Sequence, residues 1–147
     1  MGRVDRWFGH DDHHPIIDRT HGDCPCQALI TRYGDLARMR IGVIGVGSMG
    51  QNHARILADM GLLAGVSDIS PEAAKKVGDK YSVPYMTKHS DLLKGDVDAV
   101  IIVTPTTTHK KVASCALRAG KHVLLEKPMT GSSKDLVELN RQASRSK

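Results

Sequence analysis

The stretch that decides the fold is IGVIGVGSMGQNHARIL, residues 41–57, which has four glycines in its first ten positions. A β-branched run precedes the glycines and a helix-like run follows them, so the stretch predicts a strand, a tight turn and a helix. Gly45, Gly47 and Gly50 match the pattern G-x-G-x-x-G at this junction. In that pattern the first glycine permits the turn, the second lets the backbone approach a pyrophosphate, and the third lets the helix pack closely on the strand. The start of the helix, at Ser48 and Met49, supplies unpaired N–H groups and a positive dipole end to the phosphates.

An acidic residue follows at the spacing that a dinucleotide site requires. Asp68 ends the second predicted strand, 18 residues after Gly50. A carboxylate in this place accepts hydrogen bonds from the adenosine ribose and repels a 2′-phosphate, and no arginine follows it. The pattern therefore predicts a site for NAD in preference to NADP. Glycine-rich turns also occur for packing alone, so a turn without a ligand is the alternative interpretation.

Strands and helices alternate along the rest of the chain. Continuous apolar strands such as VDAVIIVT predict a parallel sheet with helices on both faces, a doubly wound α/β fold of the Rossmann type. The sequence ends before a sixth strand, so we expect the sheet to be incomplete at its C-terminal edge. The expected strands are 40–45, 62–68, 83–86, 97–104 and 122–127. The expected helices are 49–60, one that begins at Pro71, 91–94, 108–119 and 132–145.

Hydrophobic spacing indicates which helix positions face the core. Helix 49–60 carries Met49, Ile56, Leu57 and Met60 at helical spacing, and helix 108–119 carries Val112, Ala116 and Ala119. Ser70 is expected to cap the helix that begins at Pro71.

Two further segments lie where strands reach their carboxyl ends, the edge along which such sheets bind ligands. In VTPTTTH, residues 103–109, Thr104 and Pro105 are expected to run beside the cofactor, with Thr106 or Thr108 offering a hydroxyl. A threonine before a helix is also a common N-cap, which is the competing interpretation. In EKP, residues 126–128, Lys127 is expected to point into the same crevice. As a cation it could polarise a substrate oxygen or relay its proton, and the competing interpretation is a solvent-facing lysine.

Residues 1–39 differ from the rest of the chain. Their basic residues are five arginines against six acidic residues, whereas all eleven lysines lie after position 74. No sustained periodicity runs through them, so we expect an irregular N-terminal arm, disordered or non-native, and one dinucleotide-binding domain over 40–147. The cluster HDDHH, His21 and CPC could bind zinc, but Cys-Pro-Cys lacks the two-residue spacing of a structural site. We therefore predict no metal.

Composition excludes several classes of partner. The chain has 147 residues, 40% of them hydrophobic and 25% charged, as in one ordinary globular domain. The formal net charge of +5 comes from scattered lysines and only 3% of residues are aromatic, which argues against nucleic-acid binding. The sequence shows no apolar run of membrane-spanning length and no leader, and its three cysteines do not suggest a disulfide framework. These features predict a cytoplasmic protein without a nucleic-acid or membrane partner.

Three segments together resemble the N-terminal domain of the Gfo/Idh/MocA family, named after glucose–fructose oxidoreductase, inositol dehydrogenase and a rhizopine-catabolism protein. They are GVIGVGSMGQNHARIL, DVDAVIIVTPTTTH and AGKHVLLEKPM, in the family's order and spacing, and the resemblance covers about 40–147. It implies NAD-dependent hydride transfer between the nicotinamide and a secondary alcohol of a sugar, polyol or nucleotide-sugar. The Gly-Ser-Met-Gly-x-x-His run looks most like members that act on nucleotide-sugars.

The resemblance also implies roles for single residues. Lys127 would contact the nicotinamide ribose and the reacting hydroxyl as the catalytic residue, and Glu126 would lie behind it or beside the ribose. His109 matches a family histidine and would line the crevice, whereas Thr106 stands where the family often has asparagine. His53 is expected to be a partly buried histidine with its hydrogen bonds satisfied.

Members of this family continue into a second α/β domain, which covers the substrate and supplies an acid–base residue. No such domain is present in these 147 residues. We therefore expect the chain by itself to bind NAD without turning over a substrate, and a homo-oligomer would belong to a longer form. A non-catalytic NAD-binding module and an inactive truncated product are the alternatives.

Overall fold

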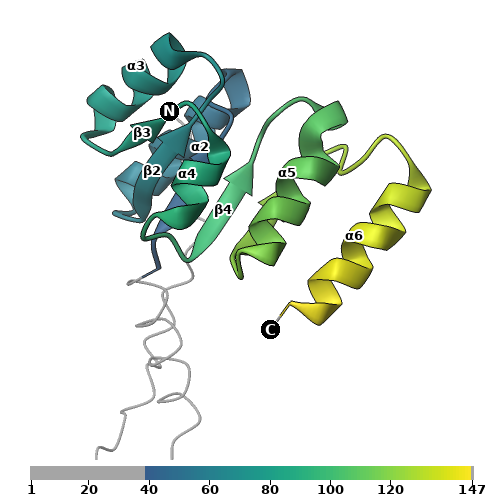
Figure 1. The fold of residues 1–147 in the computed structure, drawn as a ribbon. Helices are drawn as coiled ribbons and strands as arrows, with labels where there is room; N and C mark the ends of the chain where they lie inside the picture. The colour runs from purple at the N-terminus through teal and green to yellow at the C-terminus, as the bar shows by residue number, and fades with distance from the viewer. Residues whose placement is uncertain (1–38, 147) are drawn as a thin grey trace, which may run out of the picture.

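The computed structural model describes residues 39–146, which form a five-stranded sheet between two layers of helices (Figure 1). All neighbouring strands are parallel, and their order is β3-β2-β1-β4-β5. The doubly wound topology predicted from the sequence is confirmed. The strands of this part of the chain are β1 (Ile41–Ile44), β2 (Leu63–Ser67), β3 (Tyr85–Met86), β4 (Ala99–Ile102) and β5 (His122–Leu125). Its helices are α2 (Ser48–Asp59), α3 (Pro71–Tyr81), α4 (His89–Lys94), α5 (Thr106–Arg118) and α6 (Ser133–Arg145).

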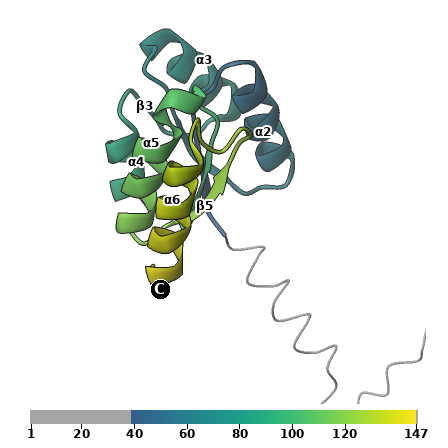
Figure 2. The same cartoon turned by 90° about the vertical axis from the view of Figure 1, so that its right-hand side faces the viewer.

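The helices divide between the two faces of the sheet. Figure 2 shows α4, α5 and α6 on one side of the sheet and α2 on the other. Val43 of β1 packs with α2 and α3, whereas its neighbour Ile44 packs with α4, α5 and α6. Because successive side chains of a strand point to opposite faces, a strand covered on both faces is apolar without a break. This explains the continuous apolar runs in the sequence.

The ends of the elements differ from the predicted ends by at most two residues. Strand β1 stops before Gly45 because that residue has a φ of +90°. Strand β4 is four residues long, since its pairing with β1 runs only from Ala99 to Ile102. Helix α5 begins two residues earlier than predicted, with Pro105 in the N-cap position. The cap of α3 is confirmed, because the Ser70 side chain accepts the N–H of Ala73 at 3.2 Å.

The predicted apolar stripe of α2 is wrong in part. Met49, Ile56 and Met60 are 52%, 46% and 62% exposed, and of the four predicted positions only Leu57 is buried. The buried residues of α2 are Gly50, Ala54 and Leu57, so small residues bring this helix close to the sheet. Ala119 of helix 108–119 is also exposed, whereas Val112 and Ala116 are buried as predicted.

Several sequence-based expectations lie outside the described residues. The expected arm, apart from Met39, and its HDDHH and CPC cluster fall within residues 1–38. Over residues 39–146, no group of three or more His, Cys, Asp or Glu side chains is arranged to hold a metal ion. None of the helices in the same range is long and apolar enough to cross a membrane.

Candidate functional site

A cleft of about 760 Å³ opens where the carboxyl ends of the strands meet the helices that follow them. Clefts of this size commonly hold small organic ligands, and this edge is where open α/β sheets bind them. Most of the residues singled out from the sequence lie on its wall. These residues are Gly45, Gly47, Ser48, Met49, Asp68, Thr104, Pro105, Thr108, Glu126 and Lys127.

The three motif glycines are needed for different reasons. A Cβ on Gly45 would lie 2.8 Å from the carbonyl oxygen of Val103, and its φ of +90° disfavours any other residue. A Cβ on Gly50 would overlap the carbonyl oxygen of Gly45, so this glycine lets α2 pack against the turn. Around Gly47 nothing lies within 4 Å of the position that a Cβ would take. The missing side chain of Gly47 therefore leaves open space on the cleft wall.

The N-terminus of α2 faces this open space. Gly47 is its N-cap, no side chain caps it, and its first turn contains no acidic residue. The first N–H groups of a helix have no partners within the helix and carry a partial positive charge. Gly47, Ser48 and Met49 all line the cleft, so this end of α2 suits a phosphate group.

Asp68 ties the end of β2 to the glycine-rich turn. Its Oδ2 accepts the N–H of Val46 at 2.8 Å, and its Oδ1 accepts the N–H of Ser70 at 2.9 Å. An ionised carboxylate accepts about four hydrogen bonds, so each oxygen retains capacity for a ligand hydroxyl. The half-buried Asp68 thus both shapes the turn and offers acceptors to the cleft.

Two threonines meet at the end of β4. The hydroxyl oxygens of Thr104 and Thr108 are 2.8 Å apart, and that of Thr108 lies 2.7 Å from the carbonyl oxygen of Pro105. Both threonines line the cleft, whereas Thr106 does not. The Thr108 hydroxyl has one proton and already faces two acceptors, on Thr104 and Pro105. It therefore stabilises the segment between β4 and α5 and has little capacity to donate to a ligand.

His109 is buried and is not one of the residues that line the cleft. It is 1% exposed, with Nε2 2.7 Å from the carbonyl oxygen of Thr104 and Nδ1 3.0 Å from that of Pro128. The ring therefore joins the segment after β4 to the segment after β5. Gly50 is likewise outside the lining, consistent with its packing against Gly45.

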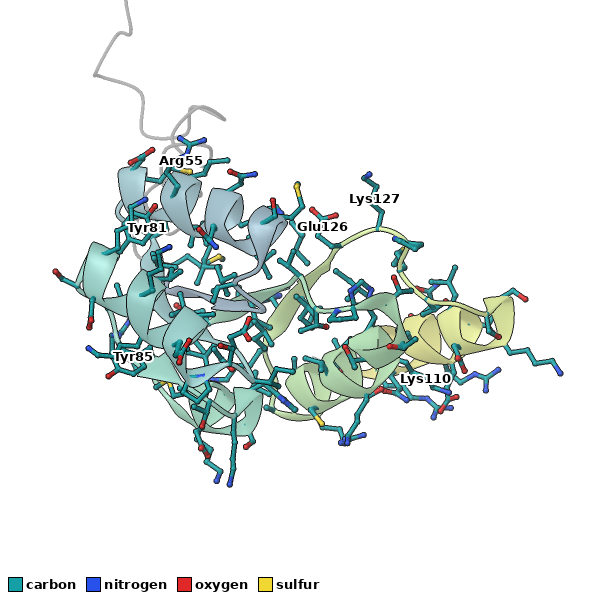
Figure 3. All side chains as sticks on the ribbon, turned by 90° about the horizontal axis from the view of Figure 1, so that it is seen from above. Arg55, Tyr81, Tyr85, Lys110, Glu126 and Lys127 are labelled. Carbon is teal, nitrogen blue, oxygen red and sulfur yellow. The ribbon has the colours of Figure 1, made fainter. Side chains whose placement is uncertain are left out.

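Glu126 and Lys127 follow β5 and differ in their surroundings. Glu126 Oε1 lies 2.8 Å from His53 Nε2, and Oε2 accepts the N–H of Lys127 at 2.9 Å. The hydrogen bond with His53, together with that from the Lys127 backbone, lowers the pKa of Glu126 below its usual value. In Figure 3 the Lys127 side chain extends outward from its loop. The structure thus gives His53 the partly buried setting expected from the sequence, and identifies Glu126 as the partner of its Nε2.

Some of the residues on the cleft wall were not singled out from the sequence. Thr87 and His89 follow β3, Ile69 follows β2, and Lys111 lies on α5 one turn beyond Thr108. The first three sit just past strand ends, so the rule that located Asp68 could have identified them. Lys111 had no such signal, because its side of α5 is fixed only by the packing of that helix.

Comparisons with known proteins agree with this architecture. Residues 39–147 match the family model GFO_IDH_MocA, described as an oxidoreductase family with an NAD-binding Rossmann fold. The chain therefore belongs to the Gfo/Idh/MocA oxidoreductase family, and the resemblance seen in its motifs is confirmed.

Individual relatives include dehydrogenases of nucleotide-sugars and polyols. UDP-N-acetylglucosamine 3-dehydrogenase of Acidithiobacillus ferrooxidans is 46% identical over 95 residues, 65% of this chain and 30% of the relative. Its solved structure superposes with a TM-score of 0.70, covering 73% of this chain and 34% of that one at 43% identity. Myo-inositol 2-dehydrogenase of Thermotoga maritima is 34% identical over 113 residues, 74% of this chain and 33% of the relative.

A third relative is a solved structure that contains bound ligands. It is the WlbA dehydrogenase of Bordetella pertussis in complex with NADH and UDP-GlcNAcA, with a TM-score of 0.70 and 28% identity over 74% of this chain and 34% of that one. The present chain thus spans about a third of the length of these relatives.

Proposed function

We propose that this protein is an NAD-dependent oxidoreductase whose cofactor is held by residues 39–146. It transfers a hydride between the nicotinamide and a secondary alcohol of a sugar, polyol or nucleotide-sugar. The observation that carries the proposal is one cleft bounded by the open space at Gly47, the carboxylate of Asp68 and the side chain of Lys127. These groups suit, in order, a pyrophosphate, a ribose diol and the reacting end of a dinucleotide.

Within this range of substrates we favour a nucleotide-sugar. The relative with 46% identity is named for its action on UDP-N-acetylglucosamine, and WlbA was solved with a UDP-sugar beside NADH. The inositol dehydrogenases share less of their sequence with this chain, 34% for the Thermotoga maritima enzyme. We also place the protein in the cytoplasm, a reducing compartment in which sparse cysteines remain thiols.

Each cleft residue has a defined task in this proposal. The N-terminus of α2 binds the pyrophosphate, and Asp68 accepts hydrogen bonds from the adenosine ribose while disfavouring a 2′-phosphate. NAD, when bound, supplies the carbon that accepts or gives up the hydride. The Lys127 ammonium donates a hydrogen bond to the substrate oxygen, which polarises the carbonyl and delivers a proton to it during reduction. In the oxidation direction the neutral amine takes the hydroxyl proton as the hydride leaves.

Calorimetric titration of NADH, NADPH and ADP into the purified chain tests this function. We expect NADH to bind with a stoichiometry of one and more tightly than NADPH. Lys127→Ala should weaken NADH binding and leave ADP binding unchanged, because ADP lacks the nicotinamide and its ribose. An unaltered, folded chain that binds none of the three nucleotides would contradict the proposal.

A further inference from the structure

Lys127 lies between two residues that are each held by a histidine from a different helix. The residue before it, Glu126, is paired with His53 of α2 at 2.8 Å. The carbonyl oxygen of the residue after it, Pro128, is 3.0 Å from Nδ1 of His109 in α5. We propose that His53 and His109 are positioning residues that together fix the backbone of Lys127 and so place the base of its side chain at the nicotinamide end of the cleft. This inference rests on the proposed function, because it concerns the residue that contacts the reacting groups there.

The two histidines act from opposite faces of the sheet. Helix α2 covers one face, and α5 covers the other (Figure 2). The segment after β5 follows an edge strand of the described sheet, where β4 is the only neighbour that can pair with it. The N–H of Glu126 is bonded to the carbonyl oxygen of Ile102 at 3.0 Å, which extends that pairing by one residue. After Glu126 the described part of the chain is no longer hydrogen-bonded to β4. The contacts with His53 and His109 hold its backbone there instead.

The chemistry of the two contacts suits a fixed backbone. His109 is 1% exposed, and both of its ring nitrogens face carbonyl oxygens, those of Thr104 and Pro128. A carbonyl oxygen can only accept, so the ring donates to one of these oxygens when it has one N–H and to both when it has two, and in each case it lies between the two segments. Glu126 receives His53 on one oxygen and the N–H of Lys127 on the other. The Glu126 carboxylate therefore connects α2, through His53, to the backbone N–H of Lys127.

The Lys127 amine is left available by this arrangement. None of the hydrogen bonds or ion pairs found within residues 39–146 involves that amine, and its side chain points outward in Figure 3. His53 lies in α2, whose N-terminus is the proposed pyrophosphate site, three residues beyond Gly50. One helix thus places both the phosphate end of the cofactor and, through Glu126, the lysine at its nicotinamide end.

Binding measurements with two nucleotides separate positioning from general stability. His53→Ala should weaken NADH binding about tenfold, equivalent to about 1.4 kcal/mol, while ADP binding changes less than twofold. His53→Gln should restore most of the NADH affinity, because its amide can donate from a place close to that of Nε2. The matched control is His122→Ala, at an exposed position of β5, which should leave both affinities unchanged.

A double-mutant cycle tests whether His53 acts through Lys127. If it does, the doubly substituted chain His53→Ala/Lys127→Ala binds NADH no more weakly than Lys127→Ala alone. His109→Gln, which keeps a donor for Thr104 and gives up the contact with Pro128, should likewise weaken NADH binding without affecting ADP. Thermal unfolding of every variant shows that it is folded at the temperature of the titration.

The outcomes distinguish this inference from the function on which it rests. Equal losses of NADH and ADP affinity in His53→Ala, or losses that add in the cycle, would overturn the positioning role. Unchanged NADH affinity in His53→Ala would overturn it as well. A failure of the unaltered chain to bind NADH would instead contradict the proposed function.

Discussion

The carboxylate of Asp68, at the end of β2, accepts the backbone N–H of Val46 in the middle of the glycine-rich turn at 2.8 Å. The same carboxylate accepts the N–H of Ser70 at 2.9 Å, which orders the start of α3. The residue proposed to read the adenosine ribose is therefore also a structural link between two loops. Its substitution should affect both cofactor choice and stability.

Asp68→Ser should narrow the preference for NADH over NADPH about tenfold, because the charge that repels a 2′-phosphate is lost. It should also lower the free energy of unfolding by roughly 1–3 kcal/mol, since hydrogen bonds to a charged acceptor are removed. Calorimetric titration and urea unfolding measure the two effects. Asp79→Ser, at an exposed position of α3, is the control and should leave the preference unchanged. Tighter binding of NADPH than NADH by the unaltered chain would contradict the specificity assigned to Asp68.

Alanine substitutions in the glycine motif should separate packing from ligand contact. Gly50→Ala places a methyl group against the Gly45 carbonyl and should lower the free energy of unfolding by about 1–3 kcal/mol or more. Gly47→Ala meets no atom within 4 Å and has a φ of −63°, so stability should change by less than about 1 kcal/mol. NADH affinity should nevertheless fall at least tenfold in Gly47→Ala, because the methyl group occupies the space proposed for the pyrophosphate.

Comparing thermal unfolding with NADH titration for the two variants checks this pair. Gly61→Ala is less suitable as a control, since Gly61 has a φ of +70°, which disfavours alanine whatever the space. Gly131→Ala is the better control, because a Cβ at Gly131 would also meet open space. If the Gly47→Ala chain binds NADH as tightly as the unaltered chain, the pyrophosphate does not lie in the space beside Gly47.

Stability should depend on pH through Glu126. Its pKa is lowered, first by the hydrogen bond with His53 and then by that from the Lys127 backbone. Between the lowered pKa and the ordinary value of about 4.5, the unfolded chain binds more protons at this site than the folded chain. The stabilisation is therefore complete above about pH 4.5 and is lost as the pH falls through the lowered pKa.

Glu126→Gln removes this stabilisation, so its difference from the unaltered chain should be larger at pH 5.5 than at pH 3.5, the two values set about the ordinary carboxyl pKa. Urea unfolding at the two pH values measures the difference. In a His53→Ala background the same substitution should show a smaller dependence on pH, because the largest cause of the shift is gone. A difference that grows toward pH 3.5 would contradict the assignment.

The sequence predicted the parts of the molecule that depend on local patterns. Gly45, Gly47 and Gly50 indicated the turn, and the 18-residue interval located Asp68 on the same edge of the sheet. Such features are readable because a parallel sheet brings every strand end to one side. The face of α2 that packs on the sheet was harder to predict. Hydrophobic periodicity marks an apolar face of a helix, but in α2 the face that carries Gly50 approaches the sheet, and Met49, Ile56 and Met60 are exposed.

Contacts between distant segments had no signal in the sequence. His53 and Glu126 are 73 positions apart, and His109 and Pro128 are 19 apart. Each residue has an ordinary interpretation by itself, as a half-buried histidine or a strand-end acid. Their relationship to Lys127 follows only from the register of β4 and β5 and from the position of α2 above the sheet.

The polypeptide of residues 1–147, assayed by itself, should bind NADH and oxidise no substrate at a useful rate. Holding a substrate in the reacting geometry is worth roughly 7–11 kcal/mol of barrier, and a general base contributes about 10²–10⁴-fold more. Among the described residues, Lys127 offers an amine at the proposed nicotinamide end, but Glu126 is already paired with His53. The Lys127 side chain extends outward in Figure 3, and contacts made in water are weaker than those in an enclosed site.

The measurement is the appearance of NADH absorbance on mixing the purified polypeptide with NAD and either UDP-N-acetylglucosamine or myo-inositol. Calorimetric binding of NADH to the same sample shows that the cofactor site is intact. A zero rate then means that the polypeptide does not hold the substrate in the reacting geometry. Lys127→Ala is the matched control, and its rate should equal the background. Sustained production of NADH by the unaltered polypeptide, abolished in Lys127→Ala, would show that Lys127 and the open cleft suffice for hydride transfer.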